Sequence, residues 1–119
     1  MGLISLPSGN PMIRVLAAHL GFEVVVFGLA IPGMIQVSGM PVGPAFAAGG
    51  GVALLALIAA ATLRRGAVGW LLGWLTQVAG IALGLATDMM FWVGGIFAAL
   101  WLMIFAMGRR LDAARSGRD

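Results

Sequence analysis

The chain has 119 residues, of which 61% are apolar and 9% are charged, and its mean hydropathy is +1.07. About 25% of the residues in a soluble domain are charged, so this composition excludes a soluble domain and indicates that lipid is the solvent. The formal charge of +3 is confined to the chain ends and one loop, so we expect contact with anionic headgroups of the bilayer and no nucleic-acid partner.

Four long apolar runs predict an all-α fold, a polytopic bundle of four transmembrane helices. Residues 1–10 form a cytoplasmic lead, and Asn10 with Pro11 is a helix start, with an Asn N-cap and proline at the first helical position. Residues 11–107 form a single transmembrane domain, and residues 108–119 form a basic cytoplasmic tail that continues the last helix. The expected spans are residues 11–33, 46–63, 67–86 and 89–107.

Turn-forming residues separate the spans. We expect Pro32 and Gly33 to kink or end the first helix, and residues 38–44, which are rich in glycine and proline, to form the outer connection. Asp88 precedes the fourth run, and we expect it to cap the N-terminus of that helix.

All basic residues are arginines, and each falls where a single side of a four-span protein would place it. Basic loop residues stay on the cytoplasmic side, so this distribution predicts a multi-pass plasma-membrane protein with both termini inside. The seven arginines are Arg14, Arg64, Arg65, Arg109, Arg110, Arg115 and Arg118. We expect the first five in this list to contact lipid headgroups.

Glycines spaced by helical steps mark candidate packing faces, because helices in lipid associate through close backbone approach. On the third span, residues 69, 73, 77, 80 and 84 share one face, which we expect to line the bundle interior. The alternative explanation is compositional bias, since the chain contains 19 glycines. The candidate packing residues are Gly21, Gly28, Gly69, Gly73, Gly80, Gly84, Gly94 and Gly95.

The candidate polar site comprises four residues within the spans. At ~1.5 Å per residue, Glu23 lies near the midplane with His19 on the same helix face, and Gln77 and Thr76 lie at a similar depth on the third span. Their similar depth in the membrane predicts a hydrogen bond between Glu23 and Gln77. Such a contact contributes about 0.6 to 1.7 kcal/mol, whereas a charge at a helix centre costs about 2.5 to 3.5 kcal/mol. We therefore expect neutral Glu23, the alternative being ionised Glu23 beside protonated His19 or a water-filled cavity.

Other chemistry has little support. The chain has one histidine and no cysteine, so we expect no metal site, no haem and no other cofactor. It has no Ser, His and Asp set and no phosphate loop, so we do not expect an enzyme.

The segments LGWLTQV (72–78), MFWVGGIFAALW (90–101) and GRRLD (108–112), with a mid-helix glutamate matched by Glu23, carry a family resemblance. They resemble an actinobacterial family of small four-helix membrane proteins known as domain of unknown function 4233. The resemblance covers most of the chain, implies the four-helix architecture and supplies no activity.

The chain is also loosely similar to small multidrug resistance transporters, which have about this length, four spans and an essential glutamate in the first span. That similarity implies a proton-coupled carrier of small molecules or cations that uses Glu23. The one-sided arginines and the lack of tyrosine argue against it, because those carriers have weak charge bias and an aromatic site. We therefore expect a structural or accessory subunit that joins a homo-oligomer or a larger membrane complex through its glycine faces.

Overall fold

The computed structural model describes residues 5–7 and 9–118, with side chains described as far as Ala114. The tail arginines Arg115 and Arg118 therefore have side chains outside the described part, as do residues 1–4 of the lead. The described chain folds into four long helices, and short 3₁₀ turns follow the second and third of them. The elements are α1 (Met12–Gln36), α2 (Val42–Thr62), η1 (Leu63–Arg65), α3 (Ala67–Ala82), η2 (Leu83–Leu85) and α4 (Met89–Arg118).

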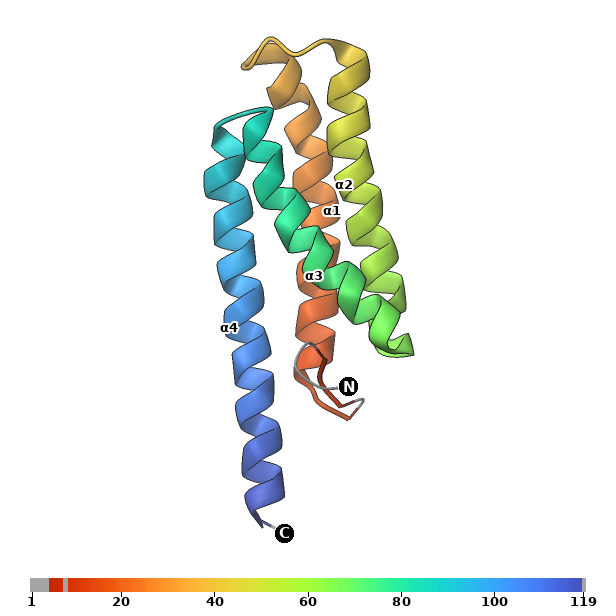
Figure 1. The fold of residues 1–119 in the computed structure, drawn as a ribbon, viewed down its shortest axis with the longest axis vertical. Helices are drawn as coiled ribbons and strands as arrows, with labels where there is room; N and C mark the ends of the chain where they lie inside the picture. The colour runs from red at the N-terminus through yellow and green to blue at the C-terminus, as the bar shows by residue number, and fades with distance from the viewer. Residues whose placement is uncertain (1–4, 8, 119) are drawn as a thin grey trace.

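The fold confirms the all-α class. Each of the four helical segments is long and apolar enough to cross a membrane. Figure 1 shows that the start of α1 and the end of α4 lie at the same end of the bundle as the α2–α3 connection. We call this the basic end, because Arg14, Arg64, Arg65, Arg109 and Arg110 are all found there and all are exposed.

Helix α3 is the most buried of the four membrane-spanning helices. It crosses obliquely in front of α1 in Figure 1, between α2 and α4. In its most apolar stretch 44% of the residues are buried, against 22 to 28% in the other three helices. Most of the surface of α1, α2 and α4 therefore faces the surroundings, which for such apolar helices means lipid.

Asn10 lies just before α1, whose first residue is Met12 and whose N-cap position is Pro11 rather than the predicted Asn10. Its side-chain oxygen accepts a hydrogen bond from the Met12 N–H at 2.9 Å. Its amide nitrogen also donates to the Gly108 carbonyl at 2.7 Å and to Oδ1 of Asp112 at 2.9 Å. The same residue thus bonds to the first residue of one helix and ties it to the last turns of another.

Two helix boundaries differ from the prediction. Helix α1 continues through Pro32 to Gln36, and α2 begins at Val42 rather than at residue 46. Pro44 is tolerated because it lies in the first turn of α2, where an N–H has no intrahelical partner to lose. Beyond Pro32, the helix persists because Met34 is fully buried and packs against Gly49 of α2.

The start of α4 uses the backbone of Asp88. The Asp88 carbonyl accepts a hydrogen bond from the Phe91 N–H at 3.0 Å. Asp88 itself is exposed and lies immediately before Met89, the first residue of the helix. The turn is therefore short, as the spacing of the third and fourth runs predicts.

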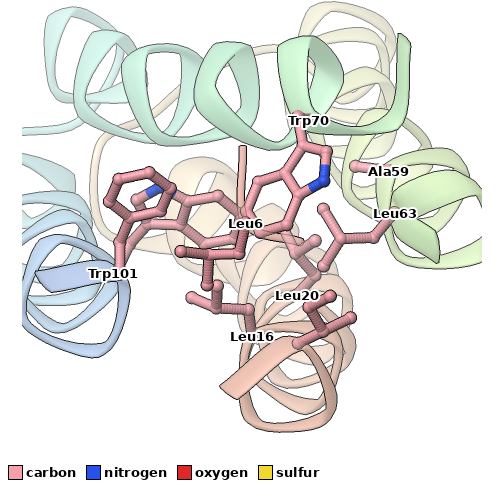
Figure 2. Packing of buried hydrophobic residues seen from close by; sticks show 9 residues of the cluster. Leu6, Leu16, Leu20, Ala59, Leu63, Trp70 and Trp101 are labelled. Carbon is pink, nitrogen blue, oxygen red and sulfur yellow. The ribbon is translucent and has the colours of Figure 1, made fainter. Parts of the chain in front are cut away.

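The largest apolar cluster lies towards the basic end of the bundle (Figure 2). Trp101 of α4 is fully buried, and its ring meets those of Trp70 and Trp74 of α3 edge-on, with centroids 6.3 and 5.8 Å apart. Phe105 extends the aromatic group along α4, 5.8 Å from Trp70 and 5.2 Å from Trp74. These rings hold α3 and α4 together below the polar site.

Three of the candidate packing glycines lie where helices cross. A Cβ added at Gly94 would lie 2.6 Å from the Gly80 carbonyl oxygen, so α4 meets the backbone of α3 there. A Cβ at Gly73 would lie 2.7 Å from Trp101, and one at Gly80 would lie 2.7 Å from Phe27 of α1. These positions accept only glycine without a shift of the neighbouring group.

Gly69 and Gly84 also face close neighbours, in Thr62 and Phe91 respectively. Gly21, Gly28 and Gly95 do not, because a Cβ at any of them meets no atom of the described chain within 4 Å. The expectation that these three glycines pack therefore fails within this chain. Their regular spacing placed them on one face of α1 or α4 but did not indicate whether that face points into the bundle.

Two further glycines have close neighbours that the sequence did not single out. A Cβ at Gly49 of α2 would lie 2.6 Å from Ile31, and one at Gly108 of α4 would lie 2.5 Å from Leu6. Gly49 is the first of three consecutive glycines, and Gly49 and Gly108 each lie opposite a large side chain from another segment of the chain.

Candidate functional site

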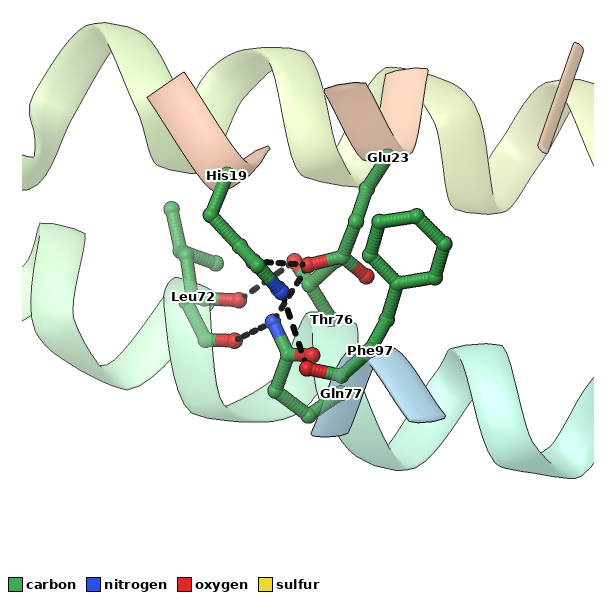
Figure 3. A network of polar contacts seen from close by, with 7 residues as sticks. His19, Glu23, Leu72, Thr76, Gln77 and Phe97 are labelled. Carbon is green, nitrogen blue, oxygen red and sulfur yellow. Dashed lines mark hydrogen bonds and ion pairs between the residues drawn. The ribbon is translucent and has the colours of Figure 1, made fainter. Parts of the chain in front are cut away.

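Three helices contribute to the polar site. Helix α1 presents His19 and Glu23 on one face, one turn apart, and α3 presents Gln77 opposite them. Helix α4 contributes the backbone carbonyl of Phe97 (Figure 3). The site therefore lies inside the bundle, where its side chains are shielded from the surroundings.

The hydrogen bond expected between Glu23 and Gln77 is present. Nε2 of Gln77 donates to Oε1 of Glu23 at 2.7 Å, and the same nitrogen lies 3.3 Å from the Gly73 carbonyl. Glu23 is 1% exposed and Gln77 is 5% exposed, so the bond is shielded from solvent. It joins α1 to α3 at the point where α3 crosses α1.

His19 extends the site to α4. Its Nε2 lies 2.8 Å from the Phe97 carbonyl oxygen, and its ring packs edge-on against the Phe97 ring with centroids 5.3 Å apart. Its Nδ1 lies 2.9 Å from Oε1 of Glu23, although the alignment there falls short of hydrogen-bond geometry. The imidazole thus bridges a carbonyl on α4 and a carboxyl group on its own helix.

The contact between His19 and Phe97 places one hydrogen. A carbonyl oxygen only accepts, so Nε2 of His19 must carry a hydrogen. Nδ1 of His19 faces Oε1 of Glu23 at 2.9 Å, where the two groups form an ion pair when the imidazole is protonated.

Thr76 is fully buried near the site but bonds within its own helix. Its hydroxyl donates to the Leu72 carbonyl at 2.7 Å, so its single proton is not available to Glu23. Of the four candidate residues, the structure joins His19, Glu23 and Gln77 and leaves Thr76 beside them. The Phe97 carbonyl is the partner that sequence reasoning missed, because a backbone group carries no signal in the sequence.

The family model described as "Protein of unknown function (DUF4233)" matches residues 14–116, which include every residue of the site. The chain belongs to this family. Comparisons with curated proteins and with solved structures give no match.

Two oxygen atoms in the polar site of this DUF4233 chain can still accept a hydrogen bond. Oε2 of Glu23 and Oε1 of Gln77 are buried and have no hydrogen-bond partner among the described residues. In Figure 3, Oε2 of Glu23 is directed towards the Phe97 ring, away from His19. The cluster can therefore accept hydrogen bonds from a further donor.

The arginines of the DUF4233 chain are distant from this cluster. They lie at the basic end, where Arg109 is placed over the Phe105 ring with 5.5 Å between the guanidinium carbon and the centroid. None of the five arginine side chains that the structure describes is paired with Glu23, which contacts His19 instead. The charge on the bundle surface and the buried polar site are therefore separate features.

Proposed function

We propose that this DUF4233 membrane protein is a structural or accessory subunit rather than an enzyme, and that Glu23 holds its helices together. The observation that carries the proposal is the use of one oxygen, Oε1 of Glu23, by Gln77 of α3 and His19 of α1. Through His19 the same cluster reaches the Phe97 carbonyl of α4. A buried carboxyl group engaged by neighbours on both sides acts as a link between helices.

Glycines that face no neighbour within the chain suggest where a partner subunit could pack. The interior glycines Gly73, Gly80 and Gly94 are used for packing within the chain, so they are unavailable to a partner. Gly21 and Gly28 of α1 are open, as is Gly95 of α4. We propose that a second copy or another membrane subunit meets the outward faces of α1 and α4.

The orientation is part of the same proposal. The basic end holds all five arginines whose side chains are described, and Asp88 is exposed at the other end. This asymmetry supports a plasma-membrane protein with both termini in the cytoplasm and with the basic end against anionic headgroups. A reporter fused after Asp119 would then be active in the cytoplasm, and periplasmic activity would refute the orientation.

A proton-coupled carrier is the second candidate function. It is favoured by the 2.9 Å contact between Glu23 and His19 and by the unpartnered oxygens of Glu23 and Gln77, which could accept hydrogen bonds from a cationic ligand. A carrier must expose its acid to water from alternate sides. Glu23 is 1% exposed and its Oε1 is held by two neighbours, which supports the structural role.

Glu23→Gln distinguishes the two functions. The amide is nearly isosteric, and with a flip of the Gln77 amide it donates to both Nδ1 of His19 and Oε1 of Gln77. For a structural subunit we expect a folded variant that loses about 0.6 to 1.7 kcal/mol of stability, because one interhelical contact is rearranged.

The measurements are the unfolding midpoint in detergent and the proton flux into proteoliposomes under an imposed pH gradient. We expect the same background flux for wild type and Glu23→Gln. Thr76→Val is the matched control, because it alters a buried polar group at the same depth that does not bond to Glu23. A flux present in the wild type and the Thr76→Val protein but absent from folded Glu23→Gln would establish the carrier instead.

A further inference from the structure

A cavity of about 550 Å³ opens at the basic end, away from Glu23. It lies between the chain that precedes α1, the first turn of α1 and the α2–α3 connection. Ile13, Leu63 and Trp70 line it and are all buried, so its floor is apolar. The cavity therefore has an apolar interior close to the surface of the bundle.

Positive charge gathers at the rim of this cavity. Arg14 of α1 and Arg64 of η1 both line it, although they are 50 positions apart in the chain. None of the described residues that line the cavity is acidic. Asp112, at the same end of the bundle, accepts a hydrogen bond from Asn10 instead. The two arginines thus line the cavity without an acidic residue among the described lining residues.

The N-terminus of α3 adds to the positive electrostatic potential at the cavity. Gly66 precedes α3 with φ of 135°, a conformation that favours glycine, and Gly66 and Ala67 both line the cavity. The first N–H groups of a helix have no intrahelical acceptor, and the helix dipole places partial positive charge there. Two arginines and a helix N-terminus therefore converge on one apolar-floored cavity.

We propose that this cavity binds the phosphate of an anionic phospholipid headgroup. Guanidinium groups and helix N-termini both bind phosphate oxygens. The apolar floor and a volume of about 550 Å³ suit a phosphate that carries a glycerol and acyl chains rather than a free ion. The position at the end of the apolar helices, where headgroups lie, favours a lipid over a soluble phosphate ester.

The test compares two double variants with the same loss of charge. Arg14→Gln with Arg64→Gln removes both cavity arginines, whereas Arg65→Gln with Arg110→Gln removes two exposed arginines that do not line the cavity. Binding of phosphatidylglycerol and of phosphatidylcholine to the full-length protein in detergent is measured by native mass spectrometry. All four arginines are exposed, so we expect every variant to fold.

We expect the cavity variant to bind phosphatidylglycerol at least about tenfold more weakly than wild type, or about 1.4 kcal/mol. The control variant should lose clearly less binding than the cavity variant, because Arg65 and Arg110 contact headgroups only outside the cavity, and phosphatidylcholine should bind poorly to all three proteins. Equal losses in the two double variants would overturn the proposal, because net charge alone would then explain binding. Displacement of the lipid by glycerol 3-phosphate at similar concentration would also overturn it and identify a site for soluble phosphate esters.

Discussion

Where α3 and α4 cross, the adjacent glycines Gly94 and Gly95 have opposite surroundings. A Cβ added at Gly94 would lie 2.6 Å from the carbonyl oxygen of Gly80, 2.7 Å from its carbonyl carbon and 2.8 Å from the Ile81 nitrogen. A Cβ added at Gly95 would meet nothing within 4 Å. Gly94→Ala should therefore destabilise the bundle, and Gly95→Ala should not.

The loss of stability expected for Gly94→Ala follows from the atoms that the added methyl group would meet. All three atoms near Gly94 belong to the backbone, so no side-chain rotation can relieve the contact. The helices must separate until the 2.6 Å distance reaches at least 3.4 Å, where ordinary van der Waals contact begins. Overpacking of this kind costs about 1 to 3 kcal/mol. Both variants gain the same helix propensity, up to about 1 kcal/mol, so their difference isolates the steric cost.

The assay is reversible unfolding by SDS titration in mixed micelles, followed by the fluorescence of the four tryptophans. We expect Gly94→Ala to unfold at a lower SDS fraction than Gly95→Ala, with a difference in unfolding free energy of about 1 to 3 kcal/mol. Gly95→Ala should match or exceed the stability of wild type. Coincident unfolding curves for the two variants would refute the close approach of α3 and α4 at this point.

Two further predictions use the same assay. Gln77→Leu keeps the volume of the side chain but removes the donor to Oε1 of Glu23, so we expect a loss of about 0.6 to 1.7 kcal/mol, and unchanged stability would show that this bond contributes nothing. Gly73→Ala should destabilise the protein because its methyl group would lie 2.7 Å from Trp101, and Trp101→Phe should reduce that cost by removing the obstructing ring atoms. Strict additivity of the Gly73 and Trp101 substitutions would contradict this contact.

Several features follow from the sequence because lipid imposes simple rules. Backbone groups in a bilayer must be satisfied within the segment, so long apolar runs have to be helices, and four such runs give four helices. Depth is also readable, since each helical residue advances ~1.5 Å along the helix. For that reason counting along two spans was sufficient to pair Glu23 with Gln77.

On α3 the glycine spacing predicted the inward face, but on α1 and α4 only the tertiary structure decided which glycines point inward. A soluble helix shows its inner face by polarity, but α4 is apolar all round within the membrane, so the sequence does not distinguish Gly94 from the adjacent Gly95, whose surroundings are opposite. The inward face is set by packing against neighbours, which also carries α1 past Pro32 and brings the Phe97 carbonyl to His19. The cavity between Arg14 and Arg64 likewise depends on segments distant in the chain, whose proximity arises from the packing of all four helices.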